Sequence, residues 1–155
     1  MAASPVEMTS AFLDFQRATL LWKISGLTDE EVRRPMVPSG NSLLAIVKHS
    51  AYVERWWFQC VFAGTDVEMI WTETDPDADW RIEPHETTAD IVALYQRECA
   101  TSRAIIAGAQ WDDLAKATRK GHTLGWILSH MVEEVSRHVG QADIFRELID
   151  GKTEE

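Results

Sequence analysis

The stretch LGWILSHMVEEVSRHVGQADIFRELIDG, residues 124–151, decides the fold. Thr123 precedes it with a hydroxyl that can cap a helix, and Gly151 ends it with the residue that most readily adopts a left-handed stop. Between these ends, apolar side chains recur at helical steps. The stretch therefore predicts a long amphipathic helix, with its core-facing positions at Trp126, Ile127, Met131, Val135, Ile144, Phe145 and Leu148.

A first long helix is predicted near the start of the chain. Ser4 supplies a capping hydroxyl, Pro5 occupies the first helical position, and Gly26 ends the pattern. A short connector helix is predicted at residues 28–34, where following prolines stop it. We expect the periodic apolar side chains of the first helix to face the core, namely Met8, Phe12, Phe15, Thr19 and Trp22.

Two further long helices are predicted in the middle of the chain. Asn41 or Ser42 caps a helix that ends at Gly64, and Thr87 or Thr88 opens another that runs to about Ala109. Residues 65–86 between them lose all periodicity and predict a long loop. Four long helices without a strand pattern predict an all-α four-helix bundle, with residues 1–155 as a single domain.

The amino-acid composition indicates which classes of binding partner are unfavourable for this chain. The chain has 155 residues, of which 45% are hydrophobic and 26% charged, as in ordinary globular proteins. Its 15 Lys and Arg against 25 Asp and Glu give a net charge of -10, which disfavours nucleic acid and anionic lipid. There is neither a secretory signal nor an apolar run of membrane-spanning length, so we expect a cytoplasmic protein. Cys60 and Cys99 lie in helical segments and are expected to be free thiols.

One face of the last predicted helix carries residues that can bind a metal. His130, Glu134 and His138 are spaced four residues apart, so they project from the same face over successive turns. Their apolar neighbours turn part of this row toward the core, where polar groups rarely lie unpaired. A divalent ion of zinc, nickel, iron or manganese would satisfy such imidazole and carboxylate donors.

A further ligand must come from another helix, and His49 is the best candidate. It lies at the rim of an apolar stripe, whereas His85 and His122 lie in polar connectors. Two histidines and one carboxylate leave coordination positions open, as in catalytic metal sites. Ordinary explanations exist as well, because a single His on an apolar face is often a core residue and Glu–His pairs four apart also occur on helix surfaces. The residue pattern alone leaves both interpretations open.

These segments resemble a known family. Residues 123–151, together with SLLAIVKHSAYVERWWF at residues 42–58, are similar to the DinB-like superfamily, especially its actinobacterial branch related to mycothiol S-transferases. The resemblance spans nearly the whole chain and implies a DinB-like four-helix bundle. It also implies a metal triad of His49, Glu134 and His138, with glutamate in the middle as in mycothiol-dependent maleylpyruvate isomerase, where the metal is zinc.

Two positions depart from the pattern that the resemblance implies. Val139 stands where an arginine is frequent, and Gln141 stands where close relatives often carry a histidine. The first departure affects the contacts around the implied metal ligands, and the second affects how the substrate would be bound. His130 is interpreted as a core residue or a residue beside the site rather than as a ligand.

The resemblance implies a metal-dependent thiol S-transferase or a thiol-dependent isomerase. A low-molecular-weight thiol such as mycothiol would bind the metal as a thiolate and add to an electrophile, as in detoxification. Trp56, Trp71, Trp80 and His130 are candidates for the wall of the substrate pocket, since aromatic surfaces hold sugars and apolar electrophiles.

Two other functions remain open from the sequence. One is a metal-assisted hydrolase, although the chain has neither an H-E-x-x-H helix nor a G-x-S-x-G elbow. The other is a stress protein that binds a metal or a small molecule without catalysis. The apolar residues of the first helix that turn outward would suit a homodimer.

Overall fold

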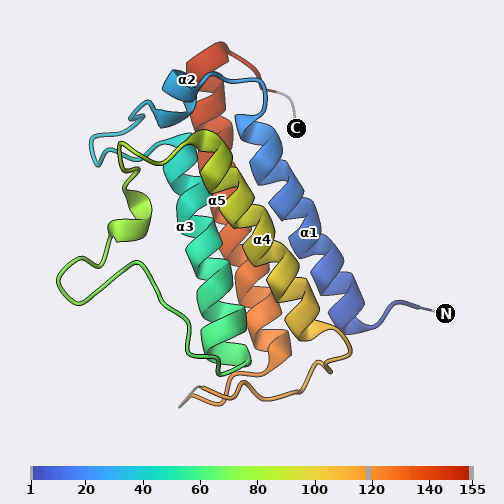
Figure 1. Cartoon of the computed structure of the whole chain (residues 1–155). Helices are drawn as coiled ribbons and strands as arrows, with labels where there is room; N and C mark the ends of the chain where they lie inside the picture. The colour runs from blue at the N-terminus through green and yellow to red at the C-terminus, as the bar shows by residue number, and fades with distance from the viewer. Residues whose placement is uncertain (1, 118–119, 154–155) are drawn as a thin grey trace.

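The computed structural model describes residues 2–117 and 120–153, and four long helices lying side by side make up most of it (Figure 1). These are α1 (Pro5–Ile24), α3 (Leu43–Glu54) with its π-helical continuation η1 (Arg55–Phe62), α4 (Thr88–Ile106) and α5 (Leu124–Asp150). The short α2 (Asp29–Arg33) connects α1 to α3, and a 3-10 turn, η2 (Ala78–Trp80), precedes α4. The predicted all-α bundle is confirmed.

The direction of the helices forces a long return of the chain. In Figure 1, α1 and α5 run upward while α3 with η1 and α4 run downward. The chain therefore leaves η1 at one end of the bundle and must reach the start of α4 at the other. Residues 65–87 make this crossover outside the helices, as in bundles that do not alternate up and down.

The capping signals in the sequence identify the helix starts correctly. The side-chain oxygens of Ser4, Thr28, Ser42, Thr87 and Thr123 each accept a backbone N–H from the first turn of the helix that follows. Three of these starts also carry the reciprocal glutamate or aspartate bond of a capping box. Within the described residues, none of the helices has the combined length and apolar character needed to cross a bilayer.

The predicted core face of α1 is wrong. Its apolar stripe faces outward, with Met8, Phe12, Phe15 and Trp22 between 44% and 67% exposed. The buried face instead carries Leu13, Leu20 and Ile24 together with two basic residues. Both faces of this helix are apolar, so periodicity alone could not decide between them. The basic face lies inward, where Arg17 pairs with the buried Glu54 of α3 and Lys23 pairs with Asp143 of α5.

The other long helices differ from the prediction in smaller ways. Trp126, Ile144 and Leu148 of α5 are exposed, while the remaining predicted core positions of that helix are buried. α4 ends at Ile106, earlier than expected. The second predicted long helix changes at Glu54 from α to π geometry, which the residue pattern does not reveal.

A buried ion pair joins α1 to α3 at this change of helix geometry. Arg17 donates to both carboxylate oxygens of Glu54, with its Nε at 2.8 Å from Oε1 and its Nη2 at 2.5 Å from Oε2. The Ser102 hydroxyl of α4 donates to the same carboxylate at 2.8 Å. Glu54 is 0% exposed and Arg17 is 3% exposed, so each depends on the other for its charge.

We predict that Glu54→Ala lowers the free energy of unfolding by about 3–5 kcal/mol, because it leaves the buried Arg17 charge without a carboxylate. Urea unfolding followed by circular dichroism measures the change. Glu133→Ala is the control, since the Glu133–Arg137 pair is about two-thirds exposed on both sides, and it should cost less than about 1 kcal/mol. Similar losses in the two variants would contradict the assigned role of Glu54.

Candidate metal centre

Three side chains from two helices converge at the middle of the bundle. His49 of α3 faces Glu134 and His138 of α5, and the ligand atoms of the three residues all lie within 4.8 Å of one another. Glu134 Oε1 is 3.1 Å from His138 Nε2 and 3.5 Å from His49 Nε2. The side chains are 10–22% exposed, so the group is screened from solvent but reachable. The structure thus brings together the three residues predicted as ligands.

The outer nitrogens of both imidazoles have acceptor partners. His49 Nδ1 lies 2.7 Å from Asp79 Oδ2, and His138 Nδ1 lies 3.0 Å from Gln141 Oε1. A carboxylate or amide oxygen accepts hydrogen bonds, so each Nδ1 carries the proton and donates it. In the neutral imidazoles, both Nε2 atoms are then left with a lone pair directed toward Glu134.

Three acceptor atoms converging on one point require positive charge between them. Added protons can supply it, and so can a cation, and two imidazole nitrogens with one carboxylate oxygen are the donors that divalent transition metals take. The partners of the two Nδ1 atoms hold the rings in the orientation that ligation needs. The residues present therefore fit a divalent metal ion.

The crossover supplies two residues that surround His49. Asp79 and Trp80 belong to η2, and the indole of Trp80 stacks on the His49 ring with centroids 3.8 Å apart and an interplanar angle of 16°. Trp80 also contacts His138 edge-on at 5.4 Å. Asp79 is 2% exposed, so it meets His49 in a site of low dielectric. The stacked indole covers one face of the His49 ring and so limits the rotation of the imidazole.

A buried lysine fixes the crossover at this place. Lys48 is 0% exposed, and its ammonium donates to the Arg81 carbonyl at 2.7 Å and pairs with Glu86 at 2.8 Å. These bonds join the segment just after Trp80 to the residue next to His49 in α3. The crossover is thus held by main-chain and side-chain bonds rather than lying loosely over the helices.

The charges of the triad affect one another. Burial alone would lower the pKa of His49, but its hydrogen bonds to Asp79 and Glu134 outweigh burial and raise it. With a proton also on each Nε2, hydrogen bonds from His138 and His49 hold the pKa of Glu134 far below its usual range. Glu134 is therefore a carboxylate throughout the physiological range and remains available as an anionic ligand.

The other residues proposed for the site occupy different positions. Trp71 contacts Tyr52 and Trp56, each at 6.2 Å between ring centroids, and these three rings form a separate group. His130 packs on Trp57 and Trp126, at 4.8 and 5.1 Å. Of the aromatic candidates, Trp80 is the one that contacts two residues of the triad.

The sequence alone does not identify two residues as partners of the candidate ligands. Asp79 lay in a segment without periodicity, so nothing tied it to His49, although an acidic residue beside Trp80 was visible. Gln141 was noted only as a departure from a family pattern. Its helical spacing of three residues from His138 places both on one face and could have identified the contact.

A cavity of about 800 Å³ opens beside His138. It lies between the segment before α3, the end of the 3-10 turn and α5, and its wall includes Trp80 and Gln141 as well as His138. The volume falls within the range of small-molecule sites in proteins. The triad is therefore adjacent to a space that can hold a substrate.

Comparison with solved structures supports the fold. A solved structure of a conserved protein from Enterococcus faecalis has a TM-score of 0.74 and 16% sequence identity, and the match covers 97% of this chain and 100% of that chain. At this identity the likeness concerns the fold alone. None of the curated proteins shows a significant match.

The sequence model of the mycothiol-S-transferase family matches residues 8–151, a range that includes His49, Glu134 and His138 as well as Asp79 and Gln141. The family resemblance seen in the sequence is thereby confirmed. The chain belongs to the mycothiol-S-transferase family of DinB-like proteins.

Proposed function

We propose that this protein is a metal-dependent thiol S-transferase that uses mycothiol or a similar low-molecular-weight thiol. The observation that carries the proposal is the convergence of two imidazole Nε2 atoms on the Glu134 carboxylate, beside a cavity of substrate size. Membership of the mycothiol-S-transferase family supports a thiol as substrate. A divalent ion in the triad, with zinc as the first choice, would lower the pKa of a coordinated thiol and so favour the nucleophilic thiolate.

The protein's own residues have separate tasks in this reaction. His49, Glu134 and His138 provide the ligand set, and its three members leave room for the thiol. Asp79 and Gln141 hold the imidazoles in the ligating tautomer through their Nδ1 atoms. Trp80 covers one face of His49 and restricts the approach of water. The sulfur then forms a bond to the electrophilic carbon, while the thiol proton goes to solvent and the leaving group departs.

The protein's own cysteines are unsuited to act as the nucleophile. Burial and the nearby Glu54 carboxylate raise the pKa of Cys99 to about 12, so it stays protonated. Burial also raises the pKa of Cys60. Both are free thiols, as predicted, and neither belongs to the triad. A thiol from outside is therefore the better nucleophile.

We predict that His49→Ala, Glu134→Ala and His138→Ala each reduce bound zinc to background, because each removes one of three ligands. Elemental analysis of purified protein after reconstitution measures the content. Glu133→Ala, which removes the neighbouring exposed carboxylate, should keep the full content. Full zinc in all three triad variants would exclude this metal centre.

We predict that Asp79→Asn weakens zinc binding about 10- to 100-fold, since the amide is a poorer acceptor for the Nδ1 proton of His49. Competition with a chelating dye measures the affinity. Asp77→Asn, two residues away on the exposed side of the crossover, is the matched control and should bind zinc like the wild type. An unchanged affinity in Asp79→Asn would show that the carboxylate does not support the ligand.

We predict that the zinc-loaded protein accelerates the conjugation of mycothiol to monobromobimane above the uncatalysed rate, and that this acceleration is lost after chelation and in Glu134→Ala. Fluorescence of the conjugate measures the initial rate. Cys60→Ser and Cys99→Ala should keep the wild-type rate, because the thiol that reacts is not part of the chain. Absence of zinc-dependent conjugation with several thiols would favour a hydrolase or a binding protein instead.

A further inference from the structure

The outward face of α1 carries a regular row of side chains, which we call the outer stripe. It consists of Met8, Phe12, Phe15, Thr19 and Trp22. The steps between these residues alternate between four and three, which is the period of the seam along which helices pack in a coiled coil. The inner face of the same helix has its own apolar residues, and the bundle covers them. A helix that is apolar on opposite faces normally lies inside a larger structure.

The outer stripe exposes enough apolar surface to form an interface. Its four large side chains are 44–67% exposed, and at about 200 Å² for each side chain this amounts to roughly 450 Å². The largest apolar patch on a typical monomer measures about 300–600 Å² and often has a function. Two such stripes packed together would bury about 900 Å². The exposed Ala11 and Ala18 beside the stripe would bring the total to the roughly 1,000 Å² that a specific interface needs.

The charged residues of α1 all have partners in the same chain. They are Glu7, Asp14, Arg17 and Lys23. The ammonium of Lys23 pairs with Asp143 at 2.7 Å and also lies 4.5 Å from the centre of the Trp22 ring. The residues on either side of the stripe are uncharged, namely Thr9, Ala11, Gln16 and Ala18. The stripe therefore presents an apolar face without an unpaired charge on α1.

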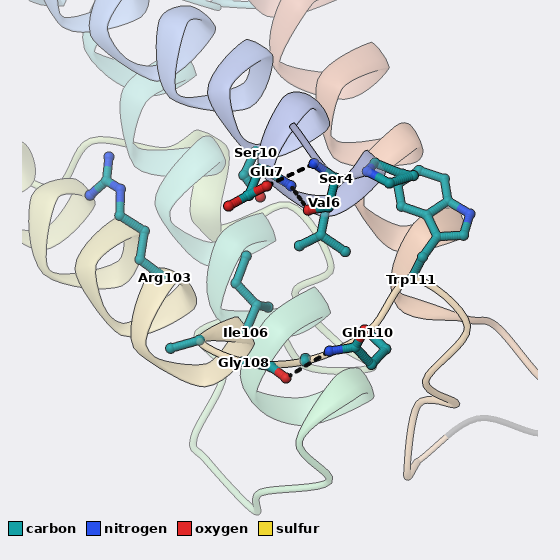
Figure 2. Close-up of a pocket in the computed structure, with 12 residues that line it drawn as sticks. Ser4, Val6, Glu7, Ser10, Arg103, Ile106, Gly108, Gln110 and Trp111 are labelled. Atoms are coloured by element: carbon teal, nitrogen blue, oxygen red, sulfur yellow. Dashed lines mark hydrogen bonds between the residues drawn. The ribbon is translucent and has the colours of Figure 1, made fainter. Parts of the chain in front are cut away.

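The cavity in Figure 2 lies on a different side of α1. It has a volume of about 570 Å³ and is enclosed by the first turn of α1 and the end of α4. Its wall includes Ser10 of α1 but none of the outer-stripe residues. Glu7 and Ser4 bind each other there within the capping box, which leaves few polar groups for a ligand. The outer stripe is thus an open face and not the rim of this cavity.

The charge of the chain favours a second copy as the occupant of this face. A net charge of -10 makes two copies repel each other over most of their surface, so they can meet only where charge is absent. Charged residues beside a helical seam normally select a different partner chain, and the uncharged flanks of this stripe give no such selection. In a two-fold dimer the same patch meets itself, so an uncharged apolar face is complementary to its own copy.

The bundle has already formed the helix that would make this contact. The stripe spans about two heptads, which is too short for a free coiled coil. However, the inner face of α1 is fixed by the core and by the Arg17–Glu54 pair. Association therefore does not bear the entropic cost of forming the helix.

We propose that two copies of this chain associate through the outer stripe of α1, around a two-fold axis that passes near Phe15. Phe15 is the middle residue of the stripe and its most exposed member, at 67%. The metal triad lies on α3 and α5, so this contact is independent of the proposed function.

Sedimentation velocity of the full chain, with and without zinc, tests the proposal over about 1–100 µM protein. The wild type should approach twice the chain mass of 17.6 kDa as its concentration rises. Phe15→Glu should remain a monomer, because a two-fold contact brings the two added carboxylates together. Leu114→Glu is the matched control, since Leu114 is 66% exposed in the connector before α5, and it should associate like the wild type.

A milder substitution guards against a loss of folding. Phe12→Gln keeps a good helix former at an exposed position and should raise the dissociation constant about tenfold, since the change occurs twice in the dimer. Circular dichroism should show the same helix content in all variants. A wild type that stays monomeric throughout, or a Phe15→Glu variant that associates as tightly as Leu114→Glu, would overturn the proposal.

A mixture of two variants tests whether the occupant is a second copy. Phe15→Glu and Phe15→Lys should each be monomeric alone, because like charges meet at the axis. Mixed in equal amounts, they should associate, since opposite charges then face each other. Absence of association in the mixture would overturn the two-fold arrangement around Phe15.

Discussion

The parallel course of α3 and α4 is the constraint on which the site depends. Because both helices run in the same direction, the chain must return along the whole bundle between them, and that return passes over His49. The same segment supplies Asp79 to the imidazole and Trp80 to its face. A bundle with alternating helix directions would connect α3 to α4 by a short turn and would leave His49 uncovered.

The crossover is held in place by a buried charged residue, Lys48. Lys48 would be unstable at 0% exposure without partners, and the Arg81 carbonyl and Glu86 provide them. The lysine and the crossover depend on each other. The crossover provides the acceptors for the buried ammonium, and the ammonium holds the crossover against α3. Lys48 and His49 are adjacent in the sequence, so the residue that anchors the crossover also fixes its register relative to the imidazole.

Much of this architecture could be predicted from the sequence, and the failures have physical reasons. Capping residues and glycines are local signals, so the helix starts could be predicted. The four-residue spacing of Glu134 and His138 is local as well, whereas His49 was chosen as a candidate by its place on another helix and by the family resemblance. The buried face of α1 depends on Arg17 meeting Glu54 from another helix, and the contact of Asp79 with His49 spans an irregular segment. Neither pairing produces a periodic pattern in the sequence from which it could be predicted. The π geometry after Glu54 likewise follows from packing rather than from a residue pattern.

The two candidate ligand histidines have unequal partners, and this inequality would suit the proposed thiolate chemistry. A divalent ion at the triad would be balanced by the carboxylates of Glu134 and Asp79, which leaves the centre close to neutral. A thiolate bound there would add a single negative charge. If residue 141 were a carboxylate like residue 79, that charge would meet a centre already negative, and the pKa of the bound thiol would rise. The amide of Gln141 orients His138 without adding charge, because its oxygen accepts the Nδ1 hydrogen bond as a neutral group.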